Sequence, residues 1–165
     1  MKKFLALLLV IAISLSLAAC ASSSAVTYYY VRNESEYLYG VSDGVLVGES
    51  REAAGHVDDL RYLLILYLHG PVSDNLTSPF PAGTKLVELT REDDALTVQL
   101  TSMFTILEGT DLTLACACLA RTCFALTDVE TVTILAMGLE TVSMTLARDD
   151  LLLMDDSAAY MTETP

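Results

Sequence analysis

The sequence predicts an α+β fold in which two helices pack on one face of a small mixed or antiparallel sheet. Residues 52–69 and 111–126 repeat apolar side chains at the three- and four-residue steps of an amphipathic helix. Residues 85–90, 95–101 and 130–136 are rich in β-branched side chains or alternate apolar with polar ones, as strands do. The predicted core order is therefore α-β-β-α-β, with extra strands at both ends.

The segment before the first helix is predicted to form strands and a turn. Residues 26–31 are β-branched or aromatic, which favours a strand. Residues 37–41 and 45–47 flank a Ser-Asp-Gly sequence that is typical of a β-hairpin turn. Packing within a sheet explains most of the tyrosines in this region, although exposed ones would suit a protein interface or a glycan platform. These tyrosines are Tyr28, Tyr29, Tyr30, Tyr37 and Tyr39.

The first helix is predicted over residues 52–69, where five apolar side chains form one stripe. Gly55 leaves the start of this helix open, because glycine loses more conformational freedom in a helix than other residues do. Gly70 and Pro71 end the helix, since glycine readily adopts the left-handed cap conformation and proline cannot continue a helix. The stripe consists of Leu60, Leu63, Leu64, Tyr67 and Leu68.

A long proline-rich loop, residues 70–83, follows the helix, whereas links of this kind usually have about two to six residues. Three prolines stiffen the loop, because each one fixes its own φ. A stiff loop loses little entropy on docking, so the loop is predicted to be a contact surface anchored by Val72, Leu76 and Phe80. In the alternative, Phe80 and Leu76 fold back and cap the core, as large apolar side chains commonly do.

The second helix is predicted over residues 111–126, with Thr110 or Asp111 as its N-cap. A strand follows the helix, and residues 139–146 are the predicted partner of that strand. Residues 150–154 are predicted to form a last short strand. The apolar stripe of the second helix consists of Leu112, Ala115, Cys116, Leu119, Cys123 and Leu126.

The N-terminus has the pattern of a lipoprotein signal peptide. Lys2 and Lys3 precede an apolar stretch, residues 4–17, and the small residues after it end in Cys20. The apolar stretch is shorter than the roughly 20 residues that a membrane span needs, so an uncleaved anchor helix is the less favoured alternative. Residues 1–19 are therefore predicted to be a signal peptide and Cys20 the site of lipid attachment, which resembles the bacterial lipobox.

The mature chain is predicted to be one acidic domain, residues 26–156, between a tether over residues 20–25 and a frayed tail over residues 157–165. Removal of Lys2 and Lys3 leaves seven basic residues against 22 acidic ones, a net charge of −15. Such a surface repels nucleic-acid phosphate, so nucleic acid is excluded as a partner. It also repels anionic lipid, so attachment to the membrane would come from the N-terminal lipid alone.

Four motifs occur in an order and spacing that resemble the GerMN domain of sporulation and spore germination. They are Leu-x-Gly-Pro at residues 68–71, Ser-Pro-Phe-Pro-x-Gly-Thr-Lys-Leu at 78–86, Ala-Leu-Thr-Val-Gln-Leu at 95–100 and Thr-Leu-Ala-Cys-Ala-Cys-Leu at 113–119. The resemblance covers about residues 55–136. It implies a fold similar to that of ring-building domains, with the same α-β-β-α-β order, and a non-enzymatic role.

One sequence pattern suggests catalysis, but its context disfavours that reading. Residues 40–44 match G-x-S-x-G, yet a nucleophile elbow needs a helix after the serine, and the residues that follow are strand-like. The paired acidic residues are predicted to lie on solvated faces and turns instead of binding metal. The sequence therefore predicts no enzyme, no metal site and no cofactor.

Three cysteines fall on the second helix with the spacing C-x-C-x4-C, which matches no zinc pattern. Cys116 and Cys123 are about 10 Å apart along the helix axis, too far for a disulfide. With Cys118, they are predicted to be small buried hydrophobic residues. A Cys–His dyad with His56 or His69 stays open as an alternative.

The resemblance implies a lipid-anchored assembly or scaffold protein on the extracytoplasmic face of the bacterial cell membrane. Its expected partners are envelope proteins of spore formation or germination, with a ring or homo-oligomer as a possible arrangement. The alternative is an accessory domain that binds cell-wall glycan or assists a wall hydrolase.

Overall fold

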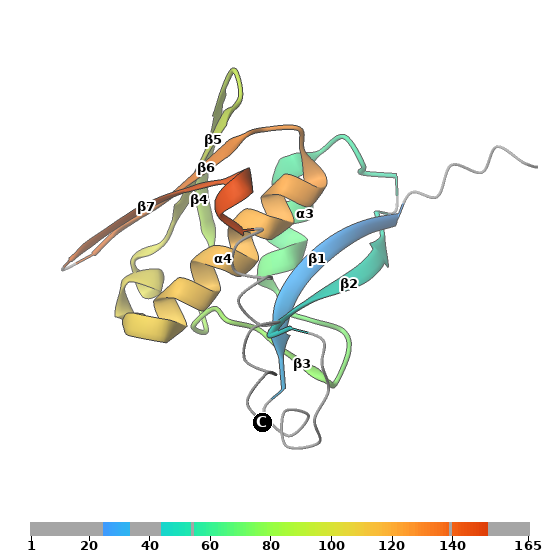
Figure 1. Cartoon of the computed structure of the whole chain (residues 1–165), viewed down its shortest axis with the longest axis horizontal. Helices are drawn as coiled ribbons and strands as arrows, with labels where there is room; N and C mark the ends of the chain where they lie inside the picture. Colours follow the sequence, from blue (N-terminus) through green and yellow to red (C-terminus); the bar gives the residue numbers. More distant parts are fainter. Residues whose placement is uncertain (1–24, 34–43, 54, 139, 152–165) are drawn as a thin grey trace, which may run out of the picture.

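The computed structural model describes residues 25–33, 44–53, 55–138 and 140–151. The predicted signal peptide, Cys20, most of the tether and the C-terminal tail lie outside these residues. Figure 1 shows the helices and strands with their labels. They are β1 (Ala25–Arg32), β2 (Leu46–Glu52), α3 (Leu60–Leu68), β3 (Leu76–Thr77), β4 (Leu86–Glu92), β5 (Ala95–Leu100), the 3-10 helix η1 (Ser102–Ile106), α4 (Gly109–Leu126), β6 (Thr131–Met137) and β7 (Thr141–Ala147).

The strands form two sheets. In the first sheet β1 lies between β2 and β3, and both pairs are antiparallel. The second sheet has the order β4-β5-β6-β7, in which β5 and β6 are parallel and the other pairs are antiparallel. Apart from β3 and η1, the chain follows the predicted order α-β-β-α-β through α3, β4, β5, α4 and β6. The predicted α+β class, with a mixed sheet and extra strands, is confirmed, and the N-terminal strands form a sheet of their own.

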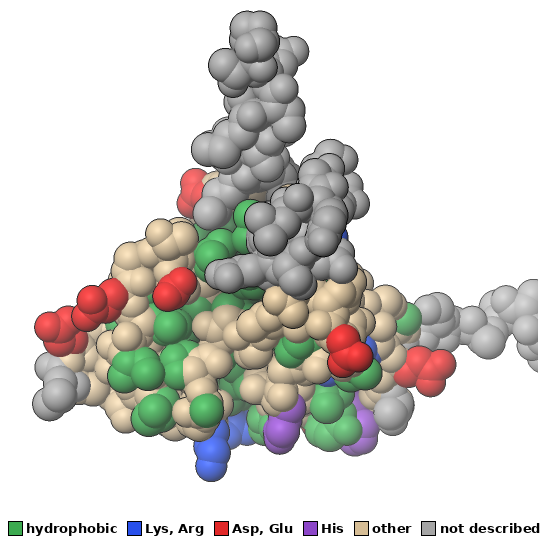
Figure 2. Space-filling view, turned by 90° about the horizontal axis from the view of Figure 1, so that it is seen from below, with side chains coloured by type: hydrophobic (Ala, Val, Ile, Leu, Met, Phe, Trp, Pro, Cys, Tyr) green, Lys and Arg blue, Asp and Glu red, His purple; other side chains and the backbone are tan. Residues whose placement is uncertain are grey.

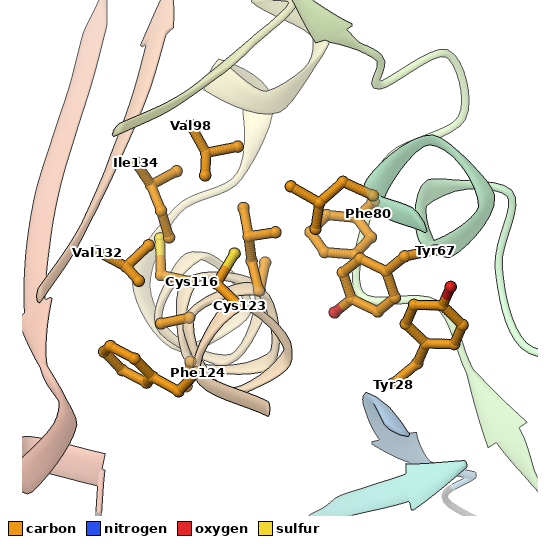
Figure 3. Packing of buried hydrophobic residues seen from close by; sticks show 14 of the residues in the cluster. Tyr28, Tyr67, Phe80, Val98, Cys116, Cys123, Phe124, Val132 and Ile134 are labelled. Atoms are coloured by element: carbon orange, nitrogen blue, oxygen red, sulfur yellow. The ribbon is translucent and has the colours of Figure 1, made fainter. Parts of the chain in front are cut away.

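Helix α4 lies between the two sheets (Figure 1). It packs against β1 on one side and against β6 and β7 on the other, while α3 packs against β4. Figure 3 shows Val98, Val132 and Ile134 on one side of α4, with Tyr67 and Phe80 on the other. All five side chains are buried, so α4 joins two apolar surfaces into one core.

Small side chains allow α4 to be buried on almost every side. Residues 115–120 read Ala-Cys-Ala-Cys-Leu-Ala, and each of them is at most 1% exposed. By length and hydropathy alone α4 could cross a membrane, yet half of it is buried inside the fold. The predicted apolar stripe on one side of α4 is therefore too narrow, because the first sheet, through β1, covers a face of the helix for which the sequence predicted no partner.

The two helices also bind the backbone of β1. The amide of Tyr29 donates a hydrogen bond to the Thr122 hydroxyl of α4 at 2.9 Å, and the Tyr67 hydroxyl of α3 donates to the carbonyl of Tyr29 at 2.8 Å. Because β3 pairs with β1 only at Val31 and Arg32, the remaining edge would otherwise leave polar groups without partners. Side chains of the helices thus replace a neighbouring strand.

The first helix is shorter than the sequence predicts. Strand β2 runs to Glu52, and α3 starts only at Leu60. Gly55 has a φ of +84°, a left-handed conformation that a right-handed helix cannot contain. The Asp59 side chain then accepts a hydrogen bond from the Tyr62 amide at 3.0 Å and caps the helix.

Two other boundaries differ from the prediction. The cap residue of α4 is Glu108, so Thr110 and Asp111 lie inside the first turn, where an aspartate stabilises the positive end of the helix dipole. Residues 148–151 are helical, where the start of a last strand was predicted. The strand predicted over residues 37–41 lies outside the described residues.

Candidate interaction surface

The loop over residues 70–83, called the proline loop below, is held at its start by a buried carboxylate. Gly70 has a φ of +98° and ends α3 where the sequence predicts it. Glu49 reaches the loop from β2, and its carboxylate accepts hydrogen bonds from the amides of Val72 at 3.0 Å and Ser73 at 2.7 Å. Glu49 is only 8% exposed, so water competes little for these bonds.

Arg51 completes this attachment. Residues two apart in a strand project from the same face, and Arg51 forms an ion pair with Glu49, with a distance of 2.6 Å from Nε to Oε2. The Nη2 atom of Arg51 donates to the carbonyl of Gly70 at 2.7 Å and to the hydroxyl of Tyr30 at 3.1 Å. Glu49 and Arg51, called the clamp below, therefore bind two amides and one carbonyl within the first four residues of the loop.

The clamp keeps its charges in a mostly apolar setting. Burial acts to raise the pKa of Glu49, but hydrogen bonds from the Ser73 amide and from Arg51 outweigh burial and hold that pKa below its ordinary value. The Arg51 guanidinium lies over the rings of Tyr28 and Tyr30, 5.1 and 5.4 Å from their centroids. Burial raises the pKa of Tyr30, so its hydroxyl stays protonated beside the guanidinium.

The three predicted contact residues of the loop have different positions. Val72 is 77% exposed, whereas Leu76 and Phe80 are 8% and 9% exposed. The Phe80 ring meets Tyr67 edge-on at 5.3 Å and lies 6.3 Å from the ring of Phe104. Of the two arrangements that the sequence left open, the structure has the one in which Phe80 and Leu76 fold back onto the core, so Phe80 is not an exposed anchor. Both cap the core instead, because burying these side chains yields more free energy than leaving them in water.

A groove of about 370 Å³ lies along the second half of the proline loop. The loop forms one of its walls, and the start of α4 forms another together with Leu107, which lies two positions before the helix. Phe80 contributes to the lining even though it is mostly buried. The lining residues are Val31, Thr77, Ser78, Pro79, Phe80, Pro81, Leu107, Asp111 and Leu114. The fixed loop thus offers an exposed Val72 and a shallow groove to a partner.

The sequence reasoning missed both residues of the clamp. The strand was predicted to stop at residue 47, so Glu49 and Arg51 had no assigned face. The Glu-x-Arg spacing itself was the available signal, because strand alternation places such a pair side by side. The contact with the proline loop could not be predicted, since the loop lies more than 20 residues further along the chain.

The cysteines of α4 are buried and free, as predicted for small hydrophobic residues. Burial raises the pKa of Cys116 and Cys123 to about 12 and raises that of Cys118 as well. His56 and His69 are exposed, so a Cys–His dyad does not form in this arrangement. Within the described residues, no group of three or more His, Cys, Asp or Glu side chains is placed to hold a metal ion.

The G-x-S-x-G pattern ends in a strand. The chain leaves Gly44 and enters β2 at Leu46, whereas a nucleophile elbow is followed by a helix. Ser42 itself lies outside the described residues. A strand therefore follows this pattern, as the sequence predicts, and not the helix that a nucleophile elbow requires.

The chain matches the model of one protein family. The match is to Germane, described as sporulation and spore germination, and extends over residues 27–142. No curated protein matches the sequence.

Two solved structures resemble this fold. The tandem GerMN domains of the sporulation protein GerM from Bacillus subtilis share 20% identity at a TM-score of 0.48, over 69% of this chain and 39% of that one. A candidate lipoprotein from Clostridium perfringens shares 15% identity at a TM-score of 0.47, over 76% of this chain and 88% of that one. The chain spans about two fifths of the tandem-domain structure. Because the family model covers most of its length, the chain belongs to the Germane family of sporulation and spore germination domains.

Proposed function

We propose that this protein is a lipid-anchored assembly module of envelope complexes in spore formation or germination. The observation that carries the proposal is the proline loop, an irregular segment that the clamp fixes at Gly70, Val72 and Ser73. A loop that is already ordered loses little entropy on binding, so it suits a contact surface. Membership in a sporulation and germination family supplies the biological setting.

The proposed location is the extracytoplasmic face of the bacterial cell membrane. It is supported by the lipobox pattern at Cys20 and by the acidic charge of the chain. A net charge this negative gives the domain itself no attraction to anionic lipid, so the N-terminal lipid would supply the attachment. The same charge disfavours nucleic acid, and the proposed partners are envelope proteins or further copies of this chain.

The glycan-binding alternative loses much of its support. Exposed tyrosines would suit it, but among the described residues Tyr28 and Tyr30 are fully buried, and the guanidinium of Arg121 lies over the ring of Tyr29, 4.6 Å from the ring centroid. Tyr37 and Tyr39 lie outside the described residues. Sugar-binding platforms of the kind considered need an aromatic face open to solvent. We therefore favour protein assembly, with no catalytic step and no cofactor, over wall binding.

Lipid attachment is tested by labelling cells with a fatty-acid probe. The wild-type chain is expected to incorporate the label, while Cys20→Ser is expected to lose it and to keep its signal peptide. Equal labelling of wild type and Cys20→Ser would overturn the proposed anchor.

The assembly role is tested by photo-crosslinking in the native membrane. A photoreactive amino acid at Val72, which is 77% exposed, is expected to capture an envelope protein. The matched control places the same group at Met137, which is 63% exposed and lies at the end of β6. Absence of a specific product from Val72, or the same products from both positions, would contradict the proposed surface.

A further inference from the structure

A second groove, called the α3–β4 groove below, lies between the end of α3 and the start of β4. Its volume is about 370 Å³. Ile65, Leu68 and Leu86 supply apolar lining, and His69 and Lys85 also line the groove. Ile65 is 41% exposed, which is high for a large apolar side chain on a helix. The groove therefore combines apolar surface with basic or imidazole side chains.

The charge around this groove is opposite to that of the chain as a whole. The chain has a formal net charge of −13, and Lys85 is its one lysine beyond residue 3. Arg61 lies beside the groove, where its guanidinium donates a hydrogen bond to the carbonyl of Val87 at 3.3 Å. Within the described residues, no salt bridge is found for Arg61 or Lys85, and no residue lining the groove carries a carboxylate. Figure 2 shows Lys or Arg and His side chains among hydrophobic ones at the lower edge of the view.

The walls of the groove are held in place by hydrogen bonds between the backbone and nearby backbone or side-chain atoms. Lys85 and Thr101 exchange two of them: the Lys85 amide donates to the Thr101 hydroxyl at 3.0 Å, and the Thr101 amide donates to the Lys85 carbonyl at 2.9 Å. On α3, the imidazole Nδ1 of His69 lies 2.7 Å from the carbonyl of Ile65. A partner would therefore meet an arrangement that needs little reordering.

The edge of β4 decides how a partner would bind. The register between β4 and β5 shifts between Leu86 and Glu88, so Val87 forms a bulge. The guanidinium of Arg61 donates a hydrogen bond to the carbonyl of Val87. A bulge and a charged side chain at a sheet edge both oppose the addition of another strand. Recognition would then come from side chains that enter the groove.

We propose that the α3–β4 groove binds a segment of a partner protein in which large apolar side chains are interspersed with carboxylates. The apolar side chains would pack against Ile65, Leu68 and Leu86, and the carboxylates would meet Lys85 and Arg61. This inference rests on the proposed assembly function and adds the chemistry of one partner. The groove and the surface around Val72 are different surfaces, so an experiment can disprove either proposal without disproving the other.

The test is a selection of random peptides displayed on phage against the full chain. Enriched peptides are expected to contain Leu, Ile, Met or Phe together with Asp or Glu. One enriched peptide is then titrated against the wild type, Ile65→Glu and Lys85→Glu. Each substitution is expected to weaken binding about tenfold or more, because each places a like charge at the site. Ile106→Glu is the matched control, since Ile106 is exposed and does not line the groove.

Retained binding by Ile106→Glu and lost binding by Ile65→Glu, with equal melting temperatures, supports the proposal. Enrichment of peptides without carboxylates, or no enrichment, overturns it. The proposal is also overturned if no peptide is selected and the groove binds something else. Self-association that sedimentation detects in the wild type but not in Ile65→Glu would mean that the groove binds a second copy of this chain. Binding to phosphatidylglycerol vesicles that is lost in Lys85→Glu would mean that it binds lipid. If the Val72 crosslink forms in the wild type but no peptide is selected, the assembly function stands and the proposal for this groove fails.

Discussion

Helix α4 and the proline loop are both fixed in the fold, but by different forces. Residues 115–120 of α4 are at most 1% exposed and pack between two sheets. The start of the loop is fixed by one carboxylate and one guanidinium, through two amides and a carbonyl. Apolar burial is insensitive to pH, whereas the clamp depends on the ionisation of Glu49. The domain thus has a core that holds its shape over a wide range of conditions and a surface loop that can be released by a change of charge.

The largest expected effect comes from the core. Leu119→Ala should lower the free energy of unfolding by about 2–5 kcal/mol, because it removes a side chain that is 1% exposed and leaves a cavity between the sheets. Urea unfolding followed by circular dichroism measures the change. The loss should be the same at pH 5 and pH 8. A loss that differs strongly between the two pH values would contradict the claim that the core, unlike the clamp, is insensitive to pH.

The clamp should show a smaller effect that depends on pH. Glu49→Gln keeps an acceptor for the Ser73 amide but leaves the charge of Arg51 without its partner, so we expect a loss of about 1.5–3 kcal/mol at neutral pH. The pKa of Glu49 is lower in the folded state than its ordinary value of 4.5. Its stabilising contribution is therefore complete above that value and disappears as the pH falls through the folded pKa.

The stability difference between wild type and Glu49→Gln should accordingly shrink below about pH 4.5. Glu92→Gln, on the exposed end of β4, is the control and should change stability by about 0.5 kcal/mol or less. A constant difference across the acid range would mean that the Glu49 charge does not hold the loop.

The contrast between the two regions also explains how much the sequence could predict. The periodicity of Leu96, Val98 and Leu100 identifies a half-buried strand, and all three are buried. Periodicity records which face is apolar but not how many layers cover it, so the burial of α4 on a second side was missed. The carboxylate of Glu49 binds loop amides more than 20 positions further along the chain, and no local pattern predicts that contact. Phe80 was left open between core and surface because prolines beside it fix the backbone without fixing where the ring points.

The thiols of α4 should behave as core atoms, with the smallest effect on stability. Replacing Cys116, Cys118 or Cys123 by alanine should cost about 1 kcal/mol each, since each change removes one buried atom. The native protein should not react with a thiol reagent at pH 8, because the thiolate is the reactive form and burial raises the pKa of these groups. All three should react in denaturant, and rapid reaction without denaturant would show that the core opens.

The central claim is that the clamp makes the proline loop a rigid element of the surface. Hydrogen exchange at the amides of Val72 and Ser73 tests it most directly, because the carboxylate of Glu49 accepts from both of these amides. At neutral pH the wild type should protect both amides, and Glu49→Gln should lose much of that protection while the amides of α4 stay protected. Fast exchange of Val72 and Ser73 in the wild type, or equal protection in both proteins, would contradict the account.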